Sequence, residues 1–233
     1  MIEIKPLASG SKGNAYQLTD GHSSLLLEAG INYREIQKGF DFKMSQVEGC
    51  LITHEHGDHS KAVKDVLKAG IDVYMSKGTK VALNLKHHRL HTVEAGEQFK
   101  IGDWYIKGFD VQHDVSEPLG FLIAKETGER ILFATDTYYI KHRFQGLTHI
   151  MVECNYSLEI LEENILDGKI PPVMKKRLLR SHFSLEHVKQ FLLANDLSKV
   201  QEIWLLHLSD TNSDAELFKK EIQAITGKVV YIA

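Results

Sequence analysis

Apolar residues along the chain alternate between short strand-like runs and stretches with helical spacing. The first part predicts strands at 2–5, 15–18 and 24–27, a helix at 33–40, a strand at 49–53, a helix at 60–69, a strand at 71–76 and a helix at 78–85. The middle predicts strands at 98–101, 104–111, 121–124, 130–135 and 148–152. The last third predicts helices at 158–166, 172–180 and 185–195, a strand at 203–206, a helix at 214–226 and a strand at 228–231. Two β-rich halves joined to helices predict an α/β fold with sheets inside helical layers.

The composition is that of an ordinary soluble protein. Of 233 residues, 43% are hydrophobic and 25% are charged, which excludes disordered and coiled-coil classes. No apolar run has membrane-spanning length and the N-terminus does not resemble a signal peptide, so we expect a cytoplasmic protein without a membrane partner. Cys50 and Cys154 lie in apolar stretches, where free buried thiols are expected. The net charge of −3 does not by itself indicate a nucleic-acid-binding protein.

A histidine-rich segment carries the strongest chemical signal. The apolar residues 50–52 lead directly into Thr-His-Glu-His-Gly-Asp-His at 53–59, the histidine motif. Nitrogen and oxygen donors are the ligands that Zn²⁺ and similar cations prefer. His54 and His56 can converge on one ion from a turning loop, and Asp58 and His59 are placed for a second. A polar surface loop that happens to be rich in histidine is the alternative, but such a loop would not follow a buried strand so abruptly.

Three further polar residues appear where later strands are predicted to end. His113 follows the strand at 104–111, Asp136 follows the strand at 130–135, and His207 follows the strand at 203–206. In layered α/β folds, sites gather at strand ends. Each residue alone would more often be a satisfied structural group. Together with the histidine motif they predict a site for two metal ions.

The order His-x-His-x-Asp-His, then His, Asp and His, resembles the metallo-β-lactamase superfamily over nearly the whole chain. The resemblance implies an αβ/βα sandwich, with two mixed β-sheets packed between helical layers and two metals at the open edge. It assigns the first metal to His54, His56 and His113, the second to Asp58, His59 and His207, and the bridging position to Asp136. β-Lactamases have Cys in place of Asp136, which argues against antibiotic hydrolysis. Oxygen-reducing members have Glu in place of His56, which argues against redox chemistry.

Further blocks resemble the YycJ (WalJ) family, single-domain bacterial and phage proteins associated with DNA exonuclease activity. These blocks lie at 7–14, 113–120, 134–137, 153–155, 181–184 and 206–209. The chain departs from the resemblance at Glu28, where the superfamily has Asp, and at Tyr156-Ser157, where the family tends to have His-Asp. The interval between Asp136 and His182 is too short for the cap of RNA-cleaving β-CASP relatives. We therefore predict one domain over 1–233.

Other residues are candidates for substrate contact. His182, just before the expected helix N-cap Ser184, could contact a phosphate or donate a proton to the leaving oxygen; a structural role at the helix start is the alternative. The loop at 9–14 could bring Ser11 and Asn14 near an anion, although a tight turn explains it nearly as well.

Two basic stretches free of acidic residues indicate where a phosphate backbone could bind. One spans 169–182 and includes Lys176, Arg177 and Arg180, and the other spans 76–91. A charged helix face exposed to solvent would explain either stretch alone about as well as phosphate binding would. His22, His142, His149 and His187 lie outside any motif, and Trp104 and Trp204 are expected in the core.

The preferred hypothesis is a two-metal phosphodiesterase that acts on DNA, most simply an exonuclease of bacterial or phage repair or recombination. A hydroxide bridging two ions, Zn²⁺ or Mn²⁺, would attack phosphorus, with Asp58 helping to orient it. The leading alternative is a hydrolase of lactones, thioesters or cyclic nucleotides on the same metals. A third hypothesis is a non-catalytic partner of recombination or repair proteins that keeps its metals for stability.

Overall fold

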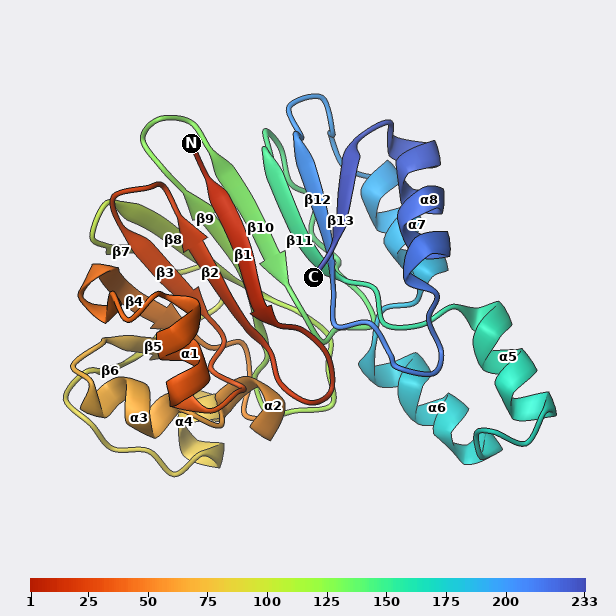
Figure 1. The fold of residues 1–233 in the computed structure, drawn as a ribbon, viewed down its shortest axis with the longest axis horizontal. Helices are drawn as coiled ribbons and strands as arrows, with labels where there is room; N and C mark the ends of the chain where they lie inside the picture. Colours follow the sequence, from red (N-terminus) through yellow and green to blue (C-terminus); the bar gives the residue numbers. More distant parts are fainter. The chain divides into compact units, whose positions relative to one another are not determined.

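The computed structural model describes residues 1–233, which divide into two compact units. The first comprises Met1–Asp110 and Val115–Phe121, and the second comprises Val111–Asp114 and Leu122–Ala233. The strands form two mixed sheets, one of six strands and one of seven (Figure 1). The predicted α/β architecture with two mixed sheets is confirmed.

The six-stranded sheet belongs to the first unit. Its strands are β1 (Glu3–Ala8), β2 (Ala15–Thr19), β3 (Ser24–Leu27), β4 (Val47–Leu51), β5 (Val73–Met75) and β6 (Leu90–Thr92). β1, β2 and β3 pair antiparallel, whereas β3 to β6 pair parallel. All of β3 is buried, as expected of a continuous apolar run inside a sheet. β1 is an edge strand and can contain Pro6, which has no N–H to donate.

The seven-stranded sheet contributes four parallel strands to the second unit. Its strands are β7 (Gln98–Ile101), β8 (Trp104–Asp110), β9 (Leu119–Ala124), β10 (Arg130–Ala134), β11 (His149–Glu153), β12 (Glu202–Leu206) and β13 (Val229–Ile232). β10 to β13 pair parallel in chain order, and β7 and β8 form an antiparallel hairpin. Every residue of β11 is buried, so the carboxyl end of this strand lies in the core.

Helices accompany the strands of each unit. The first unit contains α1 (Tyr33–Gly39), a 3₁₀ turn at Met44–Gln46, α2 (Gly57–Ser60), α3 (Val63–Lys68) and α4 (Lys77–Ala82). The second contains α5 (Leu158–Leu166), α6 (Pro172–Ser181), α7 (Leu185–Leu193) and α8 (Ala215–Thr226). α7 and α8 lie side by side near β13, while α5 and α6 lead away from these strands (Figure 1). None of the helices has both the length and the apolar character needed to cross a bilayer.

The predicted helix at 60–69 is wrong in extent, because the structure divides it. The N–H of Ala62 donates to the carbonyl of Ala29 at 2.8 Å instead of continuing a single helix, so α2 ends at Ser60 and α3 begins at Val63. β6 was not predicted, since it has three residues and only Leu90 is buried. Trp104 is buried as expected, but Trp204 is only partly buried and stacks on Tyr231.

Candidate metal centre

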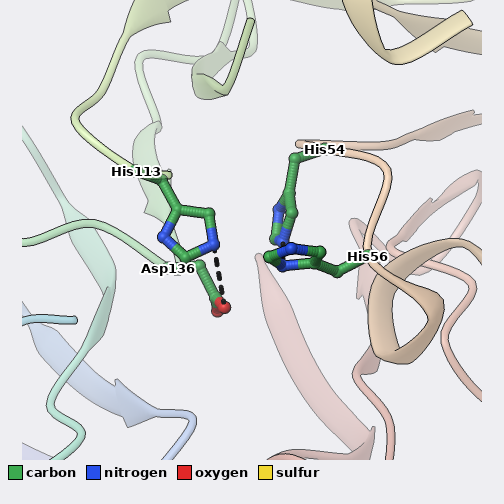
Figure 2. A group of neighbouring side chains, drawn as sticks. All are labelled: His54, His56, His113 and Asp136. Atoms are coloured by element: carbon green, nitrogen blue, oxygen red, sulfur yellow. Dashed lines mark hydrogen bonds and ion pairs between the residues drawn. The ribbon is translucent and has the colours of Figure 1, made fainter. Parts of the chain in front are cut away.

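The histidine motif begins in the loop that follows β4. His54 and His56 lie in this loop, whereas Asp58 and His59, which were also expected there, lie in α2. The His54 and His56 rings meet edge to face with centroids 4.8 Å apart (Figure 2). His54 and His59 are buried, and the ligand atoms of His54 and His56 lie within 4.8 Å of each other. The motif therefore presents closely spaced imidazoles in a largely buried setting.

The buried Glu28 side chain contacts two residues of the histidine motif. Its carboxylate accepts a hydrogen bond from the Thr53 hydroxyl at 2.5 Å. The oxygen of this hydroxyl can then accept from His54 Nδ1 at 2.9 Å, and because Nδ1 carries the proton, His54 Nε2 keeps its lone pair. The same carboxylate lies 3.5 Å from His59 Nδ1. Burial raises the pKa of Glu28, although His59 and Thr53 oppose the shift. The Glu that replaces the expected Asp thus still reaches two donors of the motif.

The loop at 9–14 is a turn that packs against α2. The N–H of Gly13 donates to Gly10 O at 3.0 Å, and the Asn14 amide lies 3.1 Å from His59 Nε2 and 3.3 Å from Asp58 O. Asn14 is buried and Ser11 is exposed. The contacts observed for Asn14 are thus with the loop, the histidine motif, Tyr16 and Gly30. Its contact with substrate, like that of Ser11, stays a prediction.

Gly30 is a position where a side chain would disturb the motif directly. A Cβ on Gly30 would overlap the carbonyl oxygen of Asp58 and lie 2.8 Å from Asn14 N. We expect Gly30→Ala to lower the free energy of unfolding by about 3 kcal/mol, the upper end of the overpacking range, because backbone must move. Chemical denaturation measures this loss. Gly57→Ala is the control, since nothing lies within 4 Å of its added Cβ. Equal losses of unfolding free energy in both variants would contradict the close packing of Gly30 against Asp58.

A second group of donors lies at the carboxyl ends of the parallel strands of the second unit. This carboxylate cluster consists of Asp136, Glu153, His182 and His207, whose ligand atoms all lie within 4.8 Å of one another. Asp136 follows β10, Glu153 ends β11 and His207 follows β12. Asp136 and His207 have positive φ values of 37° and 53°. Non-glycine residues rarely adopt this conformation, and such backbone strain is often found at functional sites.

His113 joins the carboxylate cluster through Asp136. Its Nε2 lies 3.8 Å from Asp136 Oδ2, the contact dashed in Figure 2. Its Nδ1 donates to the carbonyl of Ser181 at 2.7 Å, which fixes the ring and leaves the Nε2 lone pair facing the carboxylate. Burial lowers the pKa of His113 despite the opposing charges of Asp136 and Glu153, which favours the neutral, metal-binding form.

Glu153 organises this cluster, and the sequence did not single it out as a site residue. Oε1 lies 2.6 Å from His182 Nδ1 and 3.3 Å from His207 Nδ1, and Oε2 accepts from the N–H groups of Thr137 and Phe183. Burial alone would raise the pKa of Glu153, but the charge and hydrogen bond of His182 lower it. The sequence signal that could have identified Glu153 as a site residue was its position, as an acidic residue directly after the apolar run at 150–152.

His182 lies between two helices, as the C-cap residue that follows α6 and two positions before the N-cap Ser184 of α7. The expected N-cap is confirmed, since the Ser184 side chain accepts from His187 N. Burial would lower the pKa of His182, but Glu153 raises it above its ordinary value. The ring is 17% exposed and parallel to that of His207, with centroids 5.5 Å apart. It therefore combines a charge partner with access to solvent.

Comparison with known proteins identifies the family. The sequence matches the model described as "Beta-lactamase superfamily domain" over residues 25–194. It is 31% identical over 228 residues to "Exodeoxyribonuclease WalJ" of Streptococcus pneumoniae serotype 2, which covers 91% of this chain and 83% of that relative. The chain belongs to the WalJ/YycJ family of the metallo-β-lactamase superfamily. It is also 27% identical over 239 residues to "Exodeoxyribonuclease YycJ" of Bacillus anthracis, covering 96% and 89% of the two chains.

Solved structures agree on the fold. The metallo-β-lactamase fold protein YhfI from Bacillus subtilis matches with a TM-score of 0.76 and 14% identity, covering 100% of this chain and 95% of that one. The chain is thus a hydrolase of the metallo-β-lactamase fold, a fold that implies divalent metal ions. Its residues fit such ions: the buried donors are imidazoles and carboxylates, and two nearly inaccessible acids, Asp136 and Glu153, lie beside histidines.

Proposed function

We propose that this WalJ/YycJ-family member is a two-metal phosphodiesterase that degrades DNA as an exonuclease. The observation that carries the proposal is the position of the Asp136 carboxylate. Its Oδ2 lies 3.8 Å from His113 Nε2 and its Oδ1 lies 3.7 Å from His207 Nε2, so each oxygen faces a different imidazole. A carboxylate in this arrangement is suited to bridge two ions, whereas a single thiolate sulfur offers only one donor atom.

The ligand assignment combines the histidine motif with the carboxylate cluster. His54, His56 and His113 would hold one ion, Asp58, His59 and His207 would hold the other, and Asp136 would bridge them. Two ions such as Zn²⁺ or Mn²⁺ would supply the charge that stabilises the phosphoryl oxygens and would lower the pKa of a bound water. The Glu28–Thr53–His54 contacts and the Ser181–His113 contact would keep the imidazole rings oriented for binding.

Two residues of the chain would act on the reacting groups. Asp58, whose side chain is 24% exposed, would orient the attacking water. His182 is held through Nδ1 by Glu153 and remains partly exposed, so it would contact the phosphate or pass a proton to the leaving oxygen. In this arrangement Glu153 is a positioning residue for His182 and His207 rather than a ligand.

The DNA backbone would run along α6. Lys176, Arg177 and Arg180 are exposed and form no ion pair within the structure, whereas Lys169 pairs with Asp167 and Lys175 with Glu162. In the other basic stretch, Arg89 and His91 contact Asp72, which offsets part of its charge. Unpaired cations on one helix, together with the exonuclease names of the relatives, favour α6 as the phosphate track.

Changing this track should alter the salt dependence of binding. We expect replacement of Lys176, Arg177 and Arg180 by Gln to weaken DNA binding and to reduce the slope of log affinity against log salt by about 0.9 for each cation that contacts a phosphate. Fluorescence anisotropy at several salt concentrations measures the slope. The matched control replaces Lys219, Lys220 and Lys228, in and after α8, by Gln. An equal effect of both triple variants would place the DNA elsewhere.

The function itself is tested with end-labelled single- and double-stranded DNA and RNA. Metal-reconstituted protein should shorten DNA from an end, a chelator should stop the reaction, and Asp58→Ala and His59→Ala should abolish it while circular dichroism shows the fold retained. Undiminished cleavage by these variants would contradict the assignment. No cleavage of any nucleic acid under Zn²⁺, Mn²⁺ or Mg²⁺ would favour a hydrolase of small molecules.

A further inference from the structure

Helix α6 is exposed to solvent along most of its surface. Of its ten residues only Ser181 is buried, whereas the nine residues of α7 bury Leu185, Val188, Phe191 and Leu192. A helix as short as α6 has little stability of its own in water, and most helical stability in proteins comes from packing. The exposed side of α6 is therefore a surface on which a partner would add packing that the chain itself does not supply.

The exposed side of α5 carries acidic residues and ends in an apolar one. Glu159, Glu162 and Glu163 are exposed, and Leu166, the last residue of the helix, is 86% exposed. Spacings of three, four and seven residues place these side chains on one face of the helix. Glu162 pairs with Lys175 of α6, whereas Glu159 and Glu163 form no ion pair within the structure. This face is thus a row of negative charge with an apolar end.

The exposed side of α6 carries the same pattern in reverse order and with opposite charge. Val173, which is 76% exposed, lies near the start of the helix. Lys176, Arg177 and Arg180 follow it three, four and seven residues later, and all three are exposed. No residue of α6 is acidic. This face is thus a row of positive charge with an apolar end.

Antiparallel packing of α5 against α6 would match the two faces residue by residue. Both faces span seven positions, so every acidic residue faces a cation when the apolar residues at one end meet. The pairs that this packing forms are Leu166 with Val173, Glu163 with Lys176, Glu162 with Arg177, and Glu159 with Arg180.

A single chain does not form this contact. α5 and α6 diverge from the turn that joins them, and the ion pair between the two helices is that of Lys175 with Glu162 (Figure 1). A second copy of the chain can form the contact, because a two-fold axis sets α5 of each copy against α6 of the other and makes every pair twice. Like charges oppose the pairing of α5 with α5 or of α6 with α6, so the charges also select the orientation.

We propose that two copies of this chain associate through α5 and α6 as a symmetric dimer. The association itself does not depend on the proposed nuclease function. Its consequence rests on that function: α5 of the second copy would cover Lys176, Arg177 and Arg180, so the DNA backbone and the second copy compete for α6. Because the ion pairs lie between exposed side chains, the dimer should be weak and should dissociate as the salt concentration rises.

Reversal of charge tests the pairing directly. An acidic variant carries Lys176→Glu, Arg177→Glu and Arg180→Glu, and a basic variant carries Glu159→Lys and Glu163→Lys. Sedimentation at high protein concentration and low salt should show a dimer for wild type and about a hundredfold weaker association for each variant alone, because like charges then face each other. An equimolar mixture of the two variants should regain the dimer. A monomeric wild-type protein, or a mixture that stays monomeric, would overturn the proposal.

Two further variants separate the interface from general effects of charge. Lys219→Glu together with Lys220→Glu, on α8, should leave the dimer intact. Leu166→Ser keeps every charge and should weaken association about tenfold, since burial of one leucine side chain contributes on that scale. Circular dichroism checks that each variant is folded. A dimer that survives both charge reversals would place the interface elsewhere and would overturn the proposal.

DNA distinguishes the association from the proposed nuclease function. A duplex too short to hold two chains is titrated into the wild-type dimer, with hydrolysis prevented by a chelator, and should yield a complex of one chain with one duplex. If the dimer persists on the duplex, the competition for α6 is wrong. If wild type dimerises but neither binds nor hydrolyses DNA, the nuclease function fails and the association stands. If DNA is hydrolysed by a protein that stays monomeric, the association fails alone.

Discussion

Replacing Asp136 with Asn is expected to slow DNA hydrolysis on the order of a thousandfold or more, because charge at the proposed bridging position is lost while the shape of the side chain is kept. Asn is also one of the residues that best tolerates the positive φ of 37° at this position. The backbone should therefore stay in place, and the variant should melt near the wild-type temperature. Steady-state kinetics on end-labelled DNA measure the rate.

The same variant should also lose metal. The two Asp136 oxygens face His113 and His207, so both ions would lose one ligand. We expect reconstituted Asp136→Asn protein to hold fewer ions than wild type after dialysis. A variant with wild-type rate would contradict the bridging role, and a variant with full metal content but no activity would restrict Asp136 to the chemical step.

Replacing Glu153 with Ala is expected to lower the free energy of unfolding by about 3–5 kcal/mol, the cost of removing one partner from a buried ion pair. The carboxylate is fully buried and is bonded to His182 and to the N–H groups of Thr137 and Phe183. Each buried donor left without an acceptor adds to the loss. Urea denaturation of the metal-free protein measures it, so that metal binding does not contribute.

Glu153→Gln serves as the matched variant. The amide keeps the volume and one acceptor oxygen, so the loss should be clearly smaller than for Ala. Nuclease activity should still fall in Glu153→Gln, because His182 and His207 lose the charge that positions them. Equal stability of wild type and Glu153→Ala would contradict the central place given to this side chain.

Much of the fold was predictable because its strands are local apolar runs with clear ends. β3, β7 and α5 lie at the predicted residues, and the strand ends carry the polar residues that the order of His and Asp indicated. The break between α2 and α3 was missed because it depends on the hydrogen bond from the Ala62 N–H to the Ala29 carbonyl, a contact between residues distant in sequence. β6 was missed because two of its three residues are exposed.

The site was only partly predictable for a related reason. The candidate metal ligands follow a spacing that the sequence displays, but the residues that orient them do not. The bonds from Glu153 to His182 and from Ser181 to His113 join segments that only folding brings together. A pocket of the second unit likewise combines the loop after β10 with helix α7, so His142 and His187, which line it, showed no pattern in the sequence. The roles assigned to individual site residues stay predictions until they are measured.

The most direct test of a two-metal mechanism is the metal content of the chain measured together with its rate of DNA hydrolysis. Metal-free protein is titrated with Zn²⁺ or Mn²⁺, bound metal is determined by elemental analysis, and cleavage of end-labelled DNA is followed at each step. We predict that activity is absent without metal, reaches its maximum at two ions per chain, and is removed by a chelator. Full DNA cleavage by metal-free protein, or a maximum at one ion per chain, would contradict the two-metal mechanism.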